Sequence, residues 1–232
     1  MALCECTKIA GNKTVGDWKK RKTELGERAP ASLWALTFDE FFKARIHSRY
    51  FRPIKILKRK GGISGAGFAI VTIQCSLIEF LAASRFGKKY VHGGDESEEV
   101  YVKTGEFFTN FISSEAPFNE VFLTDKLATE FYTQVRCGLL HEASTKGLWR
   151  IQARSINGQA ICFTDKIVFR NDLQKVYNRY LRSYKSQLLE DSELQKTFIR
   201  KFDFICEGCC LTIITPPHPP AAEYQRGWRA AG

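Results

Sequence analysis

The stretch that most constrains the fold is a nearly continuous apolar run from Phe68 to Ala83. The polar residues inside it are Thr72, Gln74, Ser76 and Glu79. The run falls short of the roughly 20 apolar residues that a helix needs to cross a bilayer. A helix that is apolar on most sides is instead typical of the centre of a large core. We therefore predict a buried helix over residues 68–86, with the other elements packed around it and no membrane span.

Thr72, Ser76 and Glu79 form one narrow polar stripe on this helix, because they lie four and three residues apart. Buried polar groups need polar partners, so the stripe faces either solvent or another element. Glu79 can therefore contact a basic residue of a functional site, or it can stay a half-exposed carboxylate. Both interpretations remain open from the sequence.

The composition indicates a folded protein with an anionic partner. Of the 232 residues, 44% are hydrophobic and 18 are phenylalanine, which argues against a disordered chain. The formal charge is 35 − 25 = +10, which favours nucleic acid or an acidic membrane surface as the partner. The eight cysteines are too irregular for a disulfide scaffold, and their spacing is not that of a zinc site. We expect reduced thiols, a cytoplasmic protein and no metal or other cofactor.

Helical periodicity recurs on both sides of the apolar run. The apolar residues at helical spacing are Phe38, Phe41, Phe42 and Ile46; Phe107, Phe108, Phe111 and Ile112; Leu127, Phe131, Tyr132 and Val135; Val176, Tyr177, Tyr180, Leu181 and Tyr184; and Leu194, Phe198 and Phe202. After Gly147 the pattern alternates, and Asn157-Gly158 between two alternating runs predicts a β-hairpin. The predicted fold class is mainly α, a helical bundle with one small β-hairpin insertion.

We expect a single domain with two ends outside its core. Residues 1–30 mix Gly, Lys and Glu without an apolar period, which predicts a flexible basic N-terminal extension. Residues 31–208 contain the periodic segments and form the helical domain. Residues 209–232 include four closely spaced prolines, which is typical of a disordered Pro-rich tail.

Between Lys43 and Lys60 the chain carries eight basic residues and no acidic one. A cluster of this kind can hold a phosphate backbone, although a charge run can also be an ordinary solvated helix face. We take five basic residues as candidate RNA contacts, of which the last follows the motif described next: Lys43, Arg45, Arg49, Arg52 and Lys146.

The candidate catalytic residues are Arg136 and His141, which lie near the end of an amphipathic helix. Arginine is a permanently charged partner for phosphate, and histidine exchanges a proton near neutral pH. Basic residues at a helix end can also do no more than complement the helix dipole. On a straight helix, five residues turn the chain by roughly 140° at about 3.6 residues per turn, so the two side chains point apart. A shared site therefore needs either a break near Gly138 or a second chain.

The pattern Arg136-x4-His141, set in a helical and basic chain, resembles the HEPN superfamily over residues 31–208. The resemblance implies a helical bundle that forms a homodimer and cuts RNA without a metal. It assigns catalysis to Arg136 and His141, with the motifs of two chains facing each other across one cleft. It also suggests a toxin or phage-defence role, with an antitoxin as a candidate partner.

Cys137 departs from that pattern, because the residue after the arginine is commonly Asn, Asp or His in the family. A thiol is a weak hydrogen-bonding substitute for these side chains. The alternative function is therefore a non-catalytic helical module that binds RNA or another partner. Imidazole can move the proton of an RNA 2′-hydroxyl while guanidinium stabilises charge on the phosphate, so the enzyme hypothesis expects a 2′,3′-cyclic phosphate product.

Overall fold

The computed structural model describes residues 5–26, 29–59 and 65–211, with only the backbone described for residues 210 and 211. The protein is mainly helical, as the sequence predicts. The helices are α2 (Val15–Glu24), α3 (Ala31–Thr37), η1 (Phe38–Lys43), α4 (Ala44–Ile46), η2 (His47–Phe51), α5 (Arg52–Arg59), α6 (Ala66–Arg85), α7 (Thr104–Ser114), α8 (Asp125–Glu130), η3 (Phe131–Arg136), α9 (Cys137–His141), α10 (Arg170–Leu188) and α11 (Ser192–Leu211). The strands are β1 (Lys8–Ala10), β2 (Lys13–Thr14), β3 (Lys89–Tyr90), β4 (Val100–Tyr101), β5 (Arg150–Gln152), β6 (Ile161–Cys162) and β7 (Ile167–Phe169).

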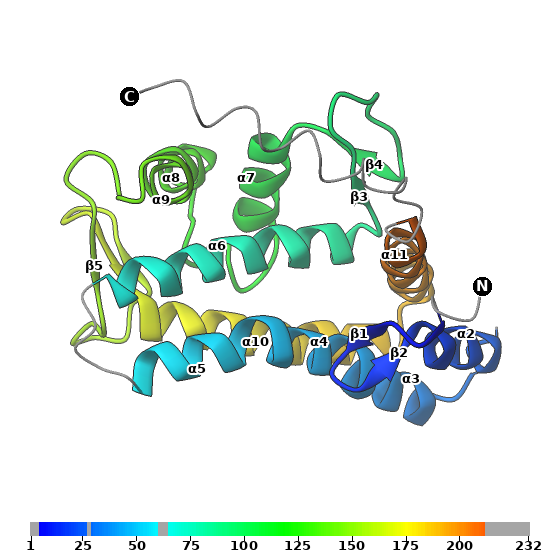
Figure 1. Ribbon diagram of the computed structural model, residues 1–232. Coiled ribbons are helices and arrows are strands. Elements are labelled where there is room, and N and C mark those ends of the chain that lie inside the picture. The colour runs from blue at the N-terminus through cyan, green and yellow to red at the C-terminus, as the bar shows by residue number, and fades with distance from the viewer. Residues whose placement is uncertain (1–4, 27–28, 60–64, 212–232) are drawn as a thin grey trace, which may run out of the picture.

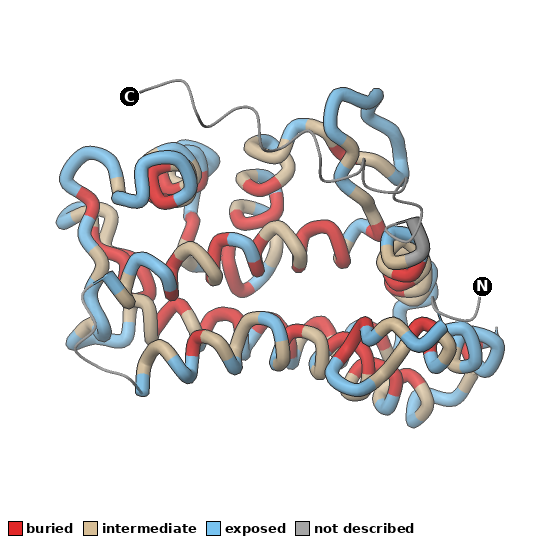
Figure 2. Tube along the Cα trace, in the orientation of Figure 1, coloured by how far each residue is buried: buried red, intermediate tan, exposed pale blue. Residues whose placement is uncertain are grey.

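Helix α6 lies at the centre of the molecule (Figure 1). On one side of it lie α10 and a long rod in which α3, η1, α4, η2 and α5 follow one another without a break. On the other side lie α7 and a second rod, α8–η3–α9. Helix α11 packs at one end of α6 and the strand β5 at the other. Buried residues are concentrated on α6 and on the helix faces turned toward it (Figure 2).

The predicted central helix is confirmed, and it is longer than the apolar run suggested. Its 20 residues make α6 long and apolar enough to span a membrane by length and composition alone. Half of the apolar window is buried inside the fold, and Ile70, Leu77 and Leu81 are fully buried. These buried residues remove apolar surface from water within the protein itself, as expected for a core helix.

Aromatic rings fill the space between the rod and α10. The ring of Phe42 stacks on Tyr184 with centroids 5.1 Å apart, and Phe38 lies 6.2 Å from the same ring. Phe42 also contacts Phe198 of α11 at 5.8 Å. The helical periodicity read from the sequence thus identifies the core positions of these three helices.

The prediction of a flexible N-terminal extension is wrong for residues 5–26. Thr14 and Asp17 form a reciprocal capping box that starts α2. Trp18 on this helix is 1% exposed, packs 4.8 Å from Phe202, and donates its Nε1–H to Asp203 at 3.0 Å. Only Val15 and Trp18 are buried on α2, too few to produce a recognisable helical period, so the sequence did not reveal that α2 completes the core against α11.

The predicted hairpin is present in a different place. Strands β6 and β7 pair antiparallel, while β5 pairs parallel with β7, so the sheet order is β5-β7-β6. The tight turn therefore spans residues 163–166, where Lys166 has φ +56°. Asn157-Gly158 lies in the longer connection between β5 and β6. The short strand β7, buried at all three positions, lacks the polar alternation that reveals a half-exposed strand.

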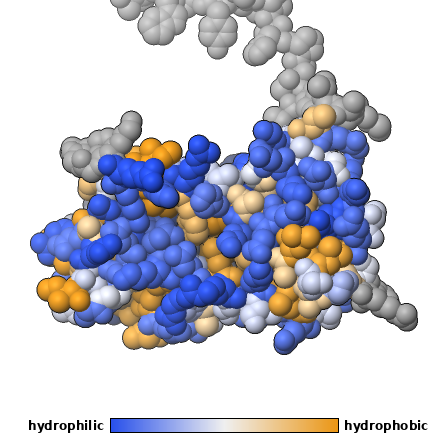
Figure 3. All heavy atoms as spheres, turned by 90° about the horizontal axis from the view of Figure 1, so that it is seen from below, coloured by the Kyte–Doolittle hydropathy of each residue, from blue (hydrophilic) through white to orange (hydrophobic). Residues whose placement is uncertain are grey.

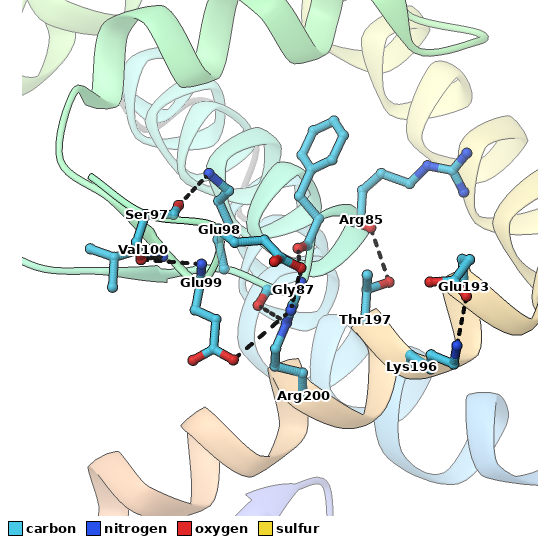
Figure 4. A network of polar contacts seen from close by, with 12 residues as sticks. Arg85, Gly87, Ser97, Glu98, Glu99, Val100, Glu193, Lys196, Thr197 and Arg200 are labelled. Atoms are coloured by element: carbon cyan, nitrogen blue, oxygen red, sulfur yellow. Dashed lines mark hydrogen bonds and ion pairs between the residues drawn. The ribbon is translucent and has the colours of Figure 1, made fainter.

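The C-terminal end of α6 is capped by the residues that directly follow it and by side chains of α11 (Figure 4). Gly87 has φ +61°, and the N–H groups of Lys88 and Gly87 donate to the carbonyls of Ala83 and Ser84. This pattern is a Schellman cap. Arg200 donates to the carbonyl oxygens of Gly87 at 2.9 Å and Phe86 at 3.0 Å, so it binds the helix end where negative charge accumulates.

The C-terminal boundary also differs from the prediction, because α11 continues through Leu211. The rest of the predicted Pro-rich tail lies outside the described residues.

Candidate functional site

The second rod carries the predicted catalytic residues. Thr124 caps α8 through a hydrogen bond from the Leu127 N–H at 3.3 Å, and the helix then widens into the π-helical segment η3 before α9. The helix stays intact at Gly138, since the N–H of Glu142 donates to the Gly138 carbonyl at 2.8 Å. Regular α-geometry over α9 keeps Arg136 and His141 roughly 140° apart about the axis. Of the two routes to a shared site, a helix break is therefore excluded.

Arg136 points toward α6, where it is 16% exposed. Its Nη2 donates to Glu79 Oε2 at 3.2 Å, and its guanidinium lies 5.2 Å from the ring centre of Tyr132. The hydroxyl of Tyr101 donates to the other oxygen of Glu79 at 3.4 Å. Glu79 thus contacts a basic residue of the predicted site, which is the first of the two possibilities that its sequence position allows.

Burial and charge set the protonation of this cluster. Burial disfavours the charge of Arg136, but Tyr132 and Glu79 outweigh it and raise the arginine pKa above its ordinary value. Burial raises the pKa of Tyr101, and the carboxylate of Glu79 raises it further. Cys75, fully enclosed nearby, has its pKa raised to about 12 by burial, so its thiol stays protonated and unreactive at neutral pH. The cluster is a fixed arginine and carboxylate pair among neutral hydroxyl and thiol groups.

His141 lies in a different environment. Its side chain is exposed, and it makes no hydrogen bond or ion pair with any residue in the described part of the chain. The neighbouring Lys146 is also exposed and pairs with Glu142 at 3.4 Å. Within one chain, Arg136 and His141 therefore do not open into a common concavity.

Gly138 is needed where α9 meets the loop that follows it. A Cβ at this position would lie 2.6 Å from the carbonyl oxygen of Ser144 and 3.1 Å from the N atom of Lys146. The same loop is fixed by the Lys146 N–H, which donates to the Gln134 carbonyl at 2.8 Å. Glycine therefore lets the chain fold back on the motif helix and places Lys146 close to it.

The predicted RNA contacts of the basic run divide between two faces of the rod. Arg45 points inward: it donates to the Ile9 carbonyl and lies 5.5 Å from the ring centre of Phe80. Burial, followed by the charge of Arg49, lowers the pKa of Arg45 to about 10. Arg49 is exposed and reaches the Lys8 carbonyl at 3.4 Å. These contacts make Arg45 a structural residue, which corrects its assignment to RNA binding.

Lys43 and Arg52 lie on the other face, where they line an open cavity of about 990 Å³ between the rod and α10. We call this cavity the basic groove. Its cationic side chains are Lys43, Arg52, Arg182 and Lys185. Arg182 and Lys185 come from α10, more than a hundred residues away in the sequence, so no local motif could have revealed the groove.

The groove wall also depends on two π-helical segments, η1 and η2. In a π-helix the hydrogen bonds join residues five apart, so residues at that spacing line up on one face. His47 begins η2, and its carbonyl accepts a hydrogen bond from the N–H of Arg52 five residues on; both residues line the groove. On an α-helix, two residues five apart would lie on different faces.

The chain matches no protein-family model, no curated protein and no solved structure. Within the described residues, no group of three or more His, Cys, Asp and Glu side chains is placed to hold a metal ion.

Proposed function

We propose that this protein is a metal-independent endoribonuclease of HEPN type that acts as a homodimer. The observation that carries the proposal is that one continuous rod holds both a positioned Arg136 and an exposed His141 whose side chain has no partner among the described residues. Imidazole serves as the general acid or base toward the RNA 2′-hydroxyl and the departing oxygen. The guanidinium stabilises the charge that grows on the phosphate.

A second chain supplies the missing half of each site. Because α9 is a regular helix, the two side chains of one protomer cannot converge on the same phosphate. Two exposed leucines near the histidine in sequence offer apolar contact area to another copy: Leu140, directly before it, is 54% exposed, and Leu148, seven residues after it, is 83% exposed. A two-fold axis near this surface brings Arg136 of one protomer toward His141 of its partner.

The cellular role follows from the family resemblance alone. We place the enzyme in the cytoplasm, in a toxin or phage-defence system, with an antitoxin protein as its candidate partner. Lys146, beside the motif, is retained as an RNA contact because it is exposed and close in sequence to His141.

The test is cleavage of a mixed RNA pool by the whole protein in excess chelator. Wild type should cut and leave 2′,3′-cyclic phosphate ends, while His141→Ala should lose about a hundredfold or more of the rate. His92→Ala, which removes an exposed histidine in another loop, is the matched control and should cut normally. Because His141 is exposed, its removal should change the free energy of unfolding by less than about 0.5 kcal/mol. Intact RNA with wild type, or equal cutting by His141→Ala, contradicts the proposal.

One observation favours the alternative of a non-catalytic helical module. The guanidinium of Arg136 is already paired with Glu79 at 3.2 Å, so it can serve the fold alone. In that case Arg136→Ala and Glu79→Gln should lower stability in a coupled way, because the remaining partner loses its counter-charge, and wild type should not cut RNA. If Arg136 is catalytic, Glu79→Gln should retain cleavage while Arg136→Ala removes it.

A further inference from the structure

The helices that line the basic groove, the rod and α10, lie on the opposite side of α6 from α9 (Figure 1). It is bounded by the rod on one side, by α10 on the other, and by the turn between β1 and β2 at one end, where Gly11 and Asn12 line it. A phosphodiester bound at His141 therefore cannot be the same group that enters this groove.

The charges in the groove leave an excess of positive charge. Four cationic side chains and one carboxylate, Asp39, line it, which leaves +3 with His47 neutral. Lys185 pairs with Asp39 at 2.6 Å, and Lys43 lies 3.6 Å from the same carboxylate. Arg52 and Arg182 have no carboxylate partner among the residues that the structure describes. Two guanidinium groups thus face the groove without a counter-charge, and they suit phosphate oxygens.

The floor of the groove is apolar. Phe38, Ala44, Phe51 and Leu181 line it between the cations. Seen from this underside, the surface of the molecule is mostly hydrophilic, with several apolar patches among the hydrophilic side chains (Figure 3). Two amide side chains, Asn12 and Asn178, are exposed at the edge of the groove and can hydrogen-bond a polar ring edge. A concave apolar surface with a few convergent polar groups is typical of a small-molecule site rather than a surface track for a polymer.

We propose that the basic groove binds a free nucleotide, with its phosphates on Arg52 and Arg182 and its base on the apolar floor near Phe51. The π-helical segment η2 provides independent support, because such widened turns recur at functional sites and here one joins His47 to Arg52, which both line the groove. A nucleotide has the three features that complement this groove: several negative charges for the guanidinium groups, a flat base for the apolar side chains, and polar ring edges for the two amides.

Calorimetry with the whole protein tests this site without any cleavage step. ATP and GTP should bind at least about tenfold more tightly than inorganic tripolyphosphate, because the floor contributes as well as the charge. They should also bind more tightly than the uncharged nucleosides. Arg52→Gln and Arg182→Gln should each weaken nucleotide binding about tenfold, since each removes one charged hydrogen-bonding group. Arg179→Gln is the matched control: it lies three residues from Arg182, pairs with Glu120 at 2.7 Å, and does not line the groove.

Three outcomes would overturn the proposal: tripolyphosphate binding as tightly as ATP and GTP, equal losses in Arg182→Gln and Arg179→Gln, or binding of single-stranded RNA but not of free nucleotides. The last outcome would reassign Lys43 and Arg52 to holding an RNA strand. His141→Ala should bind nucleotide like wild type, so a failed ribonuclease hypothesis and a failed nucleotide site remain distinguishable.

Discussion

The Arg136–His141 motif and the basic groove are opposite kinds of site. The motif is compact in sequence, yet its two side chains face different surroundings in the folded chain, one against Glu79 and one in solvent. The groove is scattered in sequence, from Asn12 to Lys185, yet its side chains line one cavity. Proximity along a helix is therefore no guide to a shared site, because a helix rotates each residue by about 100°.

The two regions also differ in what would complete them. The groove already has walls, a floor and uncompensated charge within one chain, so it needs only a ligand. The motif needs a second protomer to place an arginine and a histidine on one phosphate. Experiments that change the number of chains should affect the motif and leave the groove unchanged.

The largest expected effect is complementation between two inactive variants. Arg136→Ala and His141→Ala chains, each expressed alone, should be inactive. Co-expressed, they should regain about one quarter of wild-type cleavage, because half of the dimers are mixed and each mixed dimer rebuilds one of its two sites. The measurement is the initial rate on a labelled RNA with the two chains at equal amounts.

Recovery depends on sites that are shared between chains. If both residues acted within one protomer, no mixed dimer would contain an intact site and the rate would stay at the single-variant level. Nucleotide binding at the groove should be unchanged in both variants and in the mixture, which provides an internal check that the proteins are folded.

A smaller effect is expected from two glycine-to-alanine changes in helices. Gly138→Ala should lower the free energy of unfolding by about 1–3 kcal/mol, because the new Cβ meets the backbone of Ser144. Gly208→Ala, exposed on α11 with nothing within 4 Å of the new Cβ, should raise it by up to about 1 kcal/mol through helix propensity. Chemical denaturation measures both.

Comparing Gly138→Ala with Gly208→Ala separates the effect of packing next to the motif from the general effect of alanine on helix stability. Gly138→Ala should also reduce RNA cleavage, since the loop that positions Lys146 has to move, while nucleotide binding at the groove should persist. A Gly138→Ala protein as stable as wild type would contradict the close approach of the loop to α9.

Much of the fold could be predicted from the sequence, because helical cores are built from local periodicity. The buried faces around Phe42 and Tyr184 and the central position of α6 followed from the spacing of apolar residues. The pairing of β5 with β7 and the docking of Trp18 did not, since both are contacts between segments far apart in the chain. The same limit applies to the sites. Arg136 and His141 were visible as a motif, whereas Arg182 and Lys185 join the groove only through tertiary packing.

Two partly buried cations, Arg45 on the rod and Lys201 on α11, give the smallest expected effect, a dependence of stability on pH. Lys201 and Arg45 both lie within 6 Å of the Phe80 ring centre, at 5.9 and 5.5 Å. Burial and the charge of Arg45 lower the pKa of Lys201 from its ordinary 10.5 to about 8. Between these two values the unfolded chain binds the extra proton, so stability should increase as the pH rises through this window.

The free energy of unfolding should rise by about 1 kcal/mol from about pH 7.5 to about pH 9.5 in wild type, and Lys201→Met should abolish most of this rise. The buried Tyr180 and Tyr184 act in the opposite direction at higher pH, because burial raises their pKa values above the ordinary 10.0. The comparison therefore stays below that value. Equal pH profiles for wild type and Lys201→Met would show that Lys201 keeps its ordinary pKa.

Lys201→Met should leave nucleotide affinity unchanged, because Lys201 contacts Phe80 and the Lys88 carbonyl and does not line the groove. The cations that line the groove and the partly buried cations near Phe80 would then be separated by experiment, the first by ligand affinity and the second by stability.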